Sequence, residues 1–301
     1  GVVEPLWQTT YVIKPYESAM FSAKPITPRF GSEITSTFQL AHCSELEISD
    51  LLTLSASRGV LVFRDQTLSP SEHAALAHRL GEPLTFPLNP SDIPAELITI
   101  ASGPKTREAA GEGWHSDVSS EPKPPGLSIL KMVTVPESGG DTLFADMTQA
   151  FELLSDPLKA FLQGLTARHE PHGHYLYLSG AKAFDALPVS DHPVIRIHPV
   201  TGKKSLYIND GFVTKINGLT VRESQSLLKL LYDHIAYTVK IHCRVQWRPN
   251  TVVFWDNRSV QHHAAFDYHP ERRLGYRATL RGEQPIPSDQ NVKPSKSASL
   301  P

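Results

Sequence analysis

The sequence predicts a mainly β protein with two β layers, as in a jelly roll or a β-helix barrel, and with helices packed outside. Short β-type segments follow one another from residue 97 onward, separated by Gly, Pro, Asn or Asp. The 301 residues include 25 prolines, which suit many short strands better than long helices. Helical patterns are few, and they alternate with or precede the strands.

Two helices are expected before the strand-rich part. Residues 44–57 carry a capping box, because Ser44 is followed three positions later by Glu47. Residues 69–81 start with serine and proline and end with glycine, as helices commonly do. The apolar run VLVF at 60–63 lies between them and predicts a buried strand.

Two further helices are expected among the strands. One spans residues 147–165 and is broken near Pro157, and the other spans residues 220–237 with a second capping box from Thr220 to Glu223. The expected strands read, in order, LITIAS, GLSILKMVTV, DTLFADM, VIRIHPV, KSLYIND, TVVFWDN and RLGYRATLRG.

The chain is expected to form one domain over residues 31–285. Residues 1–30 are rich in Pro, Ser and Thr and are expected to be extended, and residues 286–301 have the composition of a disordered tail. Residues 168–192 show no clear periodicity, and a long irregular insertion in a β domain is commonly functional. We therefore expect this insertion to be a lid.

Composition excludes several classes of partner. The net charge of −2, without any polybasic run, gives no reason to expect nucleic acid or an anionic membrane. No stretch is apolar over a bilayer's width, and the first residues lack the pattern of a secretory signal. Cys43 and Cys243 are too few for a thiolate zinc cluster and fit a reducing compartment, so a cytoplasmic location is expected. The oligomeric state is left open, and a homo-oligomer is allowed.

The stretch EGWHSDVSSEP places His115 and Asp117 two residues apart. On a strand such a pair shares one face and can aim two metal ligands at one point. A third ligand is available far along the chain, where His262 and His263 are adjacent and face opposite ways on a strand. Two histidines and one carboxylate form the facial triad of non-haem Fe(II) oxygenases. Taken alone, a His-x-Asp pair is more often an ordinary loop.

Arg273 and Arg277 are four residues apart in the last strand pattern, with Gly275 between them. On one face of a strand they offer two guanidinium groups that need anions if they are buried. The alternative is that they lie in solvent or pair with Asp or Glu.

The sequence resembles the TauD/TfdA-like (taurine dioxygenase) family of Fe(II)- and 2-oxoglutarate-dependent dioxygenases. The resemblance runs from about Gly59 to Gly282 and is carried by segments in family order: VFRDQTLSPSEH, WHSDVS, PESGGDTLFADM, HPVIRIHPVTGKKSLYIND, WDNRSVQHHA and RRLGYRATLRG. It implies a double-stranded β-helix, the jelly-roll core that cupins also have.

The resemblance implies that His115, Asp117 and His262 bind Fe(2+). It implies that Thr142 and Arg273 bind the carboxylate of 2-oxoglutarate, the cosubstrate consumed with O2 to give succinate and CO2. An acid at position 117 also argues against a halogenase, which needs that position free for halide.

For the substrate, the resemblance assigns Arg277 to an acidic group and Phe212 to the pocket wall. Phe86 stands where taurine enzymes have a histidine, and no asparagine precedes His115. These differences point away from taurine itself. They favour another sulfonate, a sulfate ester, or a carboxylic or amino acid, with Phe86 against an apolar body.

The expected function is oxidation of this small acidic substrate, with hydroxylation as the first reading. Desaturation or ring closure at the same site remains an alternative, as does a non-oxidative cupin-type metalloenzyme. A binding protein without turnover is the reading that the triad and the paired arginines favour least.

Overall fold

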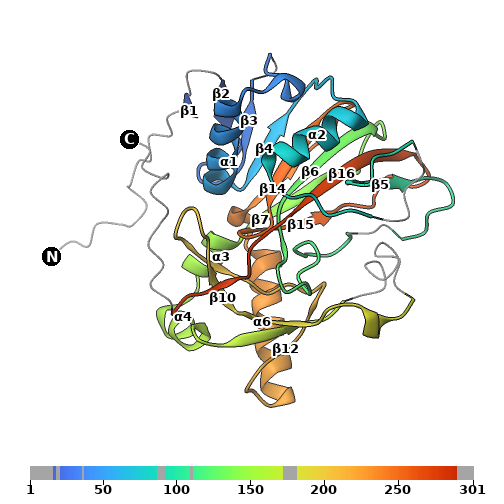
Figure 1. Cartoon of the computed structure of the whole chain (residues 1–301). Helices are drawn as coiled ribbons and strands as arrows, with labels where there is room; N and C mark the ends of the chain where they lie inside the picture. The colour runs from blue at the N-terminus through green and yellow to red at the C-terminus, as the bar shows by residue number, and fades with distance from the viewer. Residues whose placement is uncertain are drawn as a thin grey trace.

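The computed structural model describes residues 16–17, 21–35, 37–86, 92–108, 111–171 and 182–289. Figure 1 shows a large sheet with two helices on one face. A small sheet packs on its other face, and a mixed layer of helices and short strands lies beyond. A cavity lined by residues of both sheets lies between them.

The large sheet contains eight strands, all paired antiparallel except for β3 with β4. Its order in space is β1 (Tyr16–Glu17), β2 (Ser22–Pro25), β3 (Ser32–Ile34), β4 (Val60–Phe63), β14 (Val252–Asp256), β6 (Pro125–Thr134), β16 (Arg273–Arg281) and β5 (Leu97–Ser102).

Strand β4 shows why the centre of this sheet reads as a continuous apolar run. Leu61 and Phe63 point to the helix-covered face, whereas Val60 and Val62 point to the small sheet. Alternate residues of a strand face opposite sides, so a strand covered on both faces must be apolar throughout. The prediction of a buried strand at 60–63 is confirmed.

Helices α1 (Glu45–Arg58) and α2 (Pro70–Leu80) cover the outer face of the large sheet. Both predicted starts are confirmed, because the side chains of Ser44 and Ser69 each accept a hydrogen bond in a complete capping box. A short 3-10 helix, η1 (Leu40–His42), precedes α1.

The small sheet consists of β13 (His242–Val245), β7 (Thr142–Asp146) and β15 (Val260–Ala264), in this order. Its inner face packs on the large sheet through Phe144 and Val245, which meet Val253 and Trp255 of β14. Two sheets packed face to face enclose the part of the core that adjoins the cavity.

The mixed layer covers the other face of the small sheet. Its elements are α3 (Met147–Glu152), α4 (Asp156–Leu162), β8 (Thr166–His169), η2 (Phe184–Ala186), β9 (Ser190–Pro193), β10 (Ile195–Ile197), β11 (Lys204–Leu206), β12 (Val213–Ile216), α6 (Val221–Tyr237), η3 (Val239–Ile241) and β17 (Ile286–Pro287). The break predicted near Pro157 lies between α3 and α4, and the Thr220 capping box begins α6.

Two predicted domain boundaries differ from the structure. Strand β2 at 22–25 belongs to the large sheet, so the folded part begins before residue 31. Strand β17 pairs with β10, so the folded part also extends past residue 285. Of the expected lid at 168–192, the ends form the paired strands β8 and β9, and residues 172–181 lie outside the described part. Residues 290–301 of the expected tail lie outside it too.

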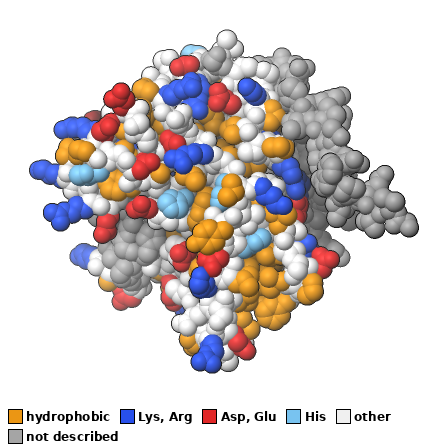
Figure 2. Space-filling view, turned by 180° about the vertical axis from the view of Figure 1, so that it is seen from behind, with side chains coloured by type: hydrophobic (Ala, Val, Ile, Leu, Met, Phe, Trp, Pro, Cys, Tyr) orange, Lys and Arg blue, Asp and Glu red, His pale blue; other side chains and the backbone are white. Residues whose placement is uncertain are grey.

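Charged side chains of both signs are interspersed over the face in Figure 2, without a large area of one sign. Within the described ranges, no helix has the length and apolar character that a bilayer crossing requires.

One buried histidine makes stability depend on pH. His73 of α2 is 1% exposed, its Nε2 donates to the Ile129 carbonyl, and burial lowers its pKa to about 4. The unfolded chain therefore takes up this proton first as pH falls below about 6.5. Above about pH 6.5 the neutral His73 contributes fully to the free energy of unfolding. As pH falls from there to about 4, this contribution decreases by about 3 kcal/mol.

We expect His73→Gln, which keeps a donor for Ile129, to reduce this acid sensitivity. Urea unfolding at pH 7.5 gives the difference in free energy of unfolding that is due to packing alone. The same measurement at pH 5 adds the contribution of His73 protonation. An equal stability difference between the two proteins at both values contradicts the assignment.

Candidate metal centre and active site

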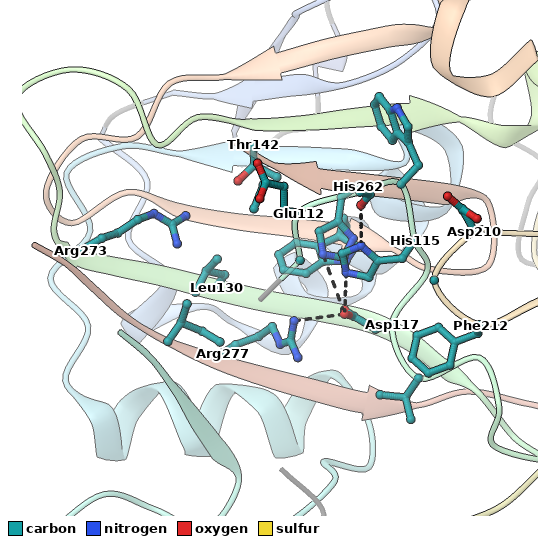
Figure 3. Close-up of a pocket in the computed structure, with 18 residues that line it drawn as sticks. Glu112, His115, Asp117, Leu130, Thr142, Asp210, Phe212, His262, Arg273 and Arg277 are labelled. Carbon is teal, nitrogen blue, oxygen red and sulfur yellow. Dashed lines mark hydrogen bonds and ion pairs between the residues drawn. The ribbon is translucent and has the colours of Figure 1, made fainter. Parts of the chain in front are cut away.

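A cavity of ≈ 300 Å³ lies between the two sheets (Figure 3). Strands β5, β6, β14 and β16 of the large sheet form one wall, and β7 and β15 of the small sheet form another. Residues 111–118 and 210–212 line the remainder. The lining combines apolar walls with a few charged groups, as small-molecule sites usually do.

His115, Asp117 and His262 converge in this cavity, each with one ligand atom within 4.8 Å of the others. The Nε2 atoms of His115 and His262 lie 3.9 and 3.8 Å from Asp117 Oδ1. Two imidazoles and one carboxylate at this spacing suit a divalent transition metal with open coordination positions.

Backbone pairing brings the ligands together across the chain. The His115 amide donates to the His262 carbonyl at 3.1 Å, and the His262 amide donates back at 2.9 Å. His262 lies on β15, but His115 forms only an isolated bridge, and Asp117 lies in a turn followed by Val118 at φ 42°. His115 and Asp117 therefore do not share a strand, the arrangement in which residues two apart would face the same side, and yet their side chains meet.

Hydrogen bonds fix two of the three ligands. His115 Nδ1 lies 2.9 Å from the Gly113 carbonyl, which can only accept, so Nδ1 carries the proton and Nε2 keeps its lone pair. Asp117 Oδ2 accepts from the Ser128 hydroxyl at 2.8 Å, so Oδ1 is the oxygen that faces the histidines.

The protonation states suit metal binding. Burial lowers the pKa of His115 and, with His115 as a neighbour, lowers that of His262 well below its usual value. Burial acts to raise the pKa of Asp117, but Arg277, His262, His115 and Ser128 outweigh it and hold the pKa below its usual value. Neutral imidazoles and an ionised carboxylate are the forms that bind a metal cation.

Arg273 and Arg277 of β16 both line the cavity (Figure 3). Arg277 donates from one terminal nitrogen to Asp117 Oδ1 at 3.1 Å. Arg273 is 7% exposed, and no carboxylate of the described residues pairs with it. Burial lowers its pKa, which reflects the cost of a buried guanidinium without an anion.

Trp247 contacts both Thr142 and Arg273 at one end of the cavity. Its indole N–H donates to Thr142 Oγ1 at 2.9 Å, and its ring centre lies 5.7 Å from the Arg273 guanidinium carbon. An indole can only donate, so the Thr142 hydroxyl proton remains available for another acceptor. The cavity that holds the three candidate ligands thus also contains the Arg273 guanidinium group and a Thr142 hydroxyl that can donate.

The comparison with known proteins agrees with this geometry. A sequence model described as "Taurine catabolism dioxygenase TauD, TfdA family" matches residues 22–279. The chain belongs to the TauD/TfdA family.

Relatives and solved structures cover most of the chain. An alpha-ketoglutarate-dependent sulfonate dioxygenase of Saccharomyces cerevisiae is 37% identical over 295 residues, which cover 90% of this chain and 71% of the relative. An alpha-ketoglutarate-dependent sulfate ester dioxygenase of Pseudomonas putida is 30% identical, with 88% and 91% covered. The crystal structure of a taurine dioxygenase from Burkholderia xenovorans superposes with a TM-score of 0.78 at 32% identity, covering 93% of this chain and 98% of that one. The mainly β fold with few helices is thus similar to that of a taurine dioxygenase.

Most residues singled out by the TauD/TfdA resemblance meet at the cavity, namely His115, Asp117, Thr142, Phe212, His262, Arg273 and Arg277. His263 does not line it and lies against Trp114 instead. Phe86 is not among the lining residues either, and residues 87–91 after it lie outside the described part, so its role stays a prediction.

Sequence reasoning missed three residues that hydrogen-bond to the site residues without being candidate ligands. Trp247 donates to Thr142, Ser128 donates to the Asp117 carboxylate, and Asn257 accepts from the Asp117 backbone amide. No motif spacing links them to the ligands, because their contacts exist only once the strands have paired.

Gly211 closes the site on the side of Phe212. A Cβ at this position would lie 2.9 Å from His115 Cβ and 3.4 Å from Asn209 Oδ1. Asn209 accepts a hydrogen bond from the Phe212 amide, and its Nδ2 donates to Ser119 Oγ at 3.0 Å, which ties this turn to the segment that follows Asp117. Phe212 therefore has a fixed place in the cavity wall.

Proposed function

We propose that the chain is an Fe(II)- and 2-oxoglutarate-dependent dioxygenase that oxidises a small acidic substrate and releases succinate and CO2. The class of 2-oxoglutarate-dependent dioxygenases is that of its family and its named relatives. One observation supports the proposal most strongly: His115, Asp117 and His262 converge in a cavity that also holds Arg273, for which the described residues provide no carboxylate partner. The two facing sheets would form the double-stranded β-helix core.

His115, Asp117 and His262 would hold Fe(II), and their forms fit it, since both imidazoles are neutral and Asp117 is ionised. When bound, the iron would supply the activation of O2 that is coupled to decarboxylation of the cosubstrate. Arg273 and Thr142 would bind the remote carboxylate of 2-oxoglutarate. The chain's own part is to orient both reactants and to exclude water.

The charges of the cavity support an anionic substrate. Asp117 is negative and Arg273 and Arg277 are positive, so these three side chains together carry one positive charge. Glu112 and Asp210 also line the cavity, but both are exposed to solvent, which screens their charges. Iron(II) and doubly ionised 2-oxoglutarate cancel each other. A substrate with a single negative group would complete the balance, which a low-dielectric cavity favours.

We propose a sulfonate or a sulfate ester as the first substrate classes to test, because the named relatives act on them. Ile100, Leu130 and Phe212 would contact an apolar body. Hydroxylation is the proposed reaction, and the product's mass separates it from desaturation or ring closure: one oxygen gained against two hydrogens lost. We also propose a cytoplasmic location, which two free, buried cysteines favour.

The test is a screen for succinate release stimulated by sulfonates, sulfate esters and carboxylates, with neutral analogues of the same carbon skeleton as controls. We expect stimulation only by anions. Equal stimulation by the neutral analogues would contradict an acidic substrate, and the lack of any 2-oxoglutarate turnover would contradict the enzyme class.

Arg277→Lys separates charge from shape at the proposed substrate site. Lysine keeps a positive charge near Asp117 but loses the planar fork that binds an oxyanion through two nitrogens. We expect the substrate KM to rise about 10-fold, corresponding to roughly 1.4 kcal/mol, while 2-oxoglutarate binding persists. An unchanged KM for every anion tested would remove Arg277 from substrate recognition.

A further inference from the structure

The two carboxylate oxygens of Asp117 have different surroundings. Oδ1 faces His115 and His262 and accepts a hydrogen bond from Arg277 at 3.1 Å, whereas Oδ2 accepts one from Ser128 Oγ at 2.8 Å. Asp117 is 3% exposed and Ser128 is fully buried, so bulk water does not compete for these atoms. When the Ser128 hydroxyl is directed to Oδ2, that oxygen is engaged, and Oδ1 keeps its place next to the two histidines.

The partners of Asn257 fix the orientation of its side-chain amide. The Trp255 indole N–H and the Asp117 backbone N–H can only donate, and both point to Asn257 Oδ1, at 3.2 and 3.1 Å. The Gly126 carbonyl can only accept, and it lies 3.1 Å from Nδ2. A flipped amide would place donor against donor and acceptor against acceptor, so only one orientation satisfies every partner.

This orientation decides what Ser128 does. Asn257 Nδ2 donates to Ser128 Oγ at 2.9 Å, so the serine oxygen is an acceptor there. The serine O–H is then directed to its other neighbour, Asp117 Oδ2. Asn257 is 1% exposed, and its own carbonyl accepts from Ser116 Oγ at 3.0 Å, which ties it to the residue before Asp117.

We propose that Asn257 is a positioning residue for the metal site, which acts through Ser128. Asn257 directs the Ser128 hydroxyl onto Asp117 Oδ2 and holds the Asp117 backbone, and this leaves Oδ1 as the ligating oxygen. The inference rests on the proposed function, because it takes Asp117 as a metal ligand. Substitution of a residue that hydrogen-bonds to a metal ligand commonly lowers metal affinity by about 10–100-fold.

The first test removes the hydroxyl. We expect Ser128→Ala to weaken Co(II) binding to the 301-residue chain about 10-fold, measured by anaerobic calorimetric titration. The Co(II) absorption spectrum should also change, since the freed Asp117 oxygen can join the coordination sphere. An unchanged affinity and spectrum would overturn the proposal.

The second test redirects the hydroxyl. In Asn257→Asp, both side-chain oxygens of residue 257 can only accept a hydrogen bond. The Ser128 hydroxyl can then donate to residue 257 instead of Asp117 Oδ2, so the hydrogen bond to Asp117 is weakened. We expect Asn257→Asp to weaken Co(II) binding as well, but to cost nothing further when Ser128 is already alanine. Full additivity of the two losses would show that Asn257 does not act through Ser128.

A matched control separates positioning from packing. Ser205 is also fully buried, and its hydroxyl contacts Thr148 Oγ1 at 3.0 Å, outside the cavity lining. Ser205→Ala should lower the melting temperature much as Ser128→Ala does, with Co(II) affinity kept. If the wild-type protein does not bind Co(II) or Fe(II), the proposed function fails; if it binds and the variants match it, only this inference fails.

Discussion

Asp117→Ala is expected to abolish metal binding and succinate formation together. Asp117 supplies the only carboxylate of the candidate triad within the described residues, and its Oδ1 lies within 4 Å of both histidine Nε2 atoms. Losing a ligand should cost more than the about 10–100-fold in affinity that follows from altering residues behind a ligand. The measurement is anaerobic Fe(II) titration in the presence of 2-oxoglutarate, followed by the visible metal-to-ligand charge-transfer band.

Asp210→Ala is the matched control for this variant. Asp210 also lines the cavity with a carboxylate, but it does not belong to the converging group. We expect the charge-transfer band to persist in Asp210→Ala and to vanish in Asp117→Ala. A band of normal intensity in Asp117→Ala would refute the ligand assignment.

Arg273→Met is expected to have the second large effect, on the cosubstrate. Removing one partner of a buried, hydrogen-bonded charge pair costs about 2–5 kcal/mol, so the apparent Kd of 2-oxoglutarate should rise at least about 30-fold. The same change should leave the melting temperature of the ligand-free protein unchanged or raise it. The reason is that Arg273 is buried without a carboxylate partner among the described residues, and methionine removes that charge.

Two readouts make this experiment decisive. Co(II) affinity in the absence of 2-oxoglutarate should stay at the wild-type level, because Arg273 takes no part in the triad. Arg273→Lys should recover part of the 2-oxoglutarate affinity, since a point charge remains. Unchanged 2-oxoglutarate binding in Arg273→Met would favour the non-oxidative metalloenzyme, which does not need Arg273.

Local signals predicted the elements well because each depends on neighbouring residues. Ser44 and Glu47 satisfy each other within one helical turn, and β4 needs only to be apolar on both faces. The domain ends depend on distant partners instead. Strand β17 is only two residues long and is defined by its pairing with β10, which no local pattern announces.

The site residues likewise fall into those that the sequence could predict and those that depend on the folded structure. His115 and Asp117, with a histidine at 262 or 263, could be proposed from the residues because a metal site needs several ligands of these types. The family resemblance chose His262, added Thr142 and gave Arg273 its cosubstrate role. The turn at Asp117 could not be predicted, since it replaces a strand that the spacing allowed equally well. The roles of Ser128, Asn257 and Trp247 depend on hydrogen-bond directions that exist only in the folded cavity.

The contact at Gly211 sets a boundary for anyone who wishes to redesign the catalyst. Because a methyl group there would lie 2.9 Å from the Cβ of His115, we expect substitutions at this position to displace the His115 side chain before they alter selectivity. Phe212, one residue on, faces the cavity and can be varied without that contact. Libraries aimed at new substrates are therefore best focused on Phe212, with its glycine neighbour held constant.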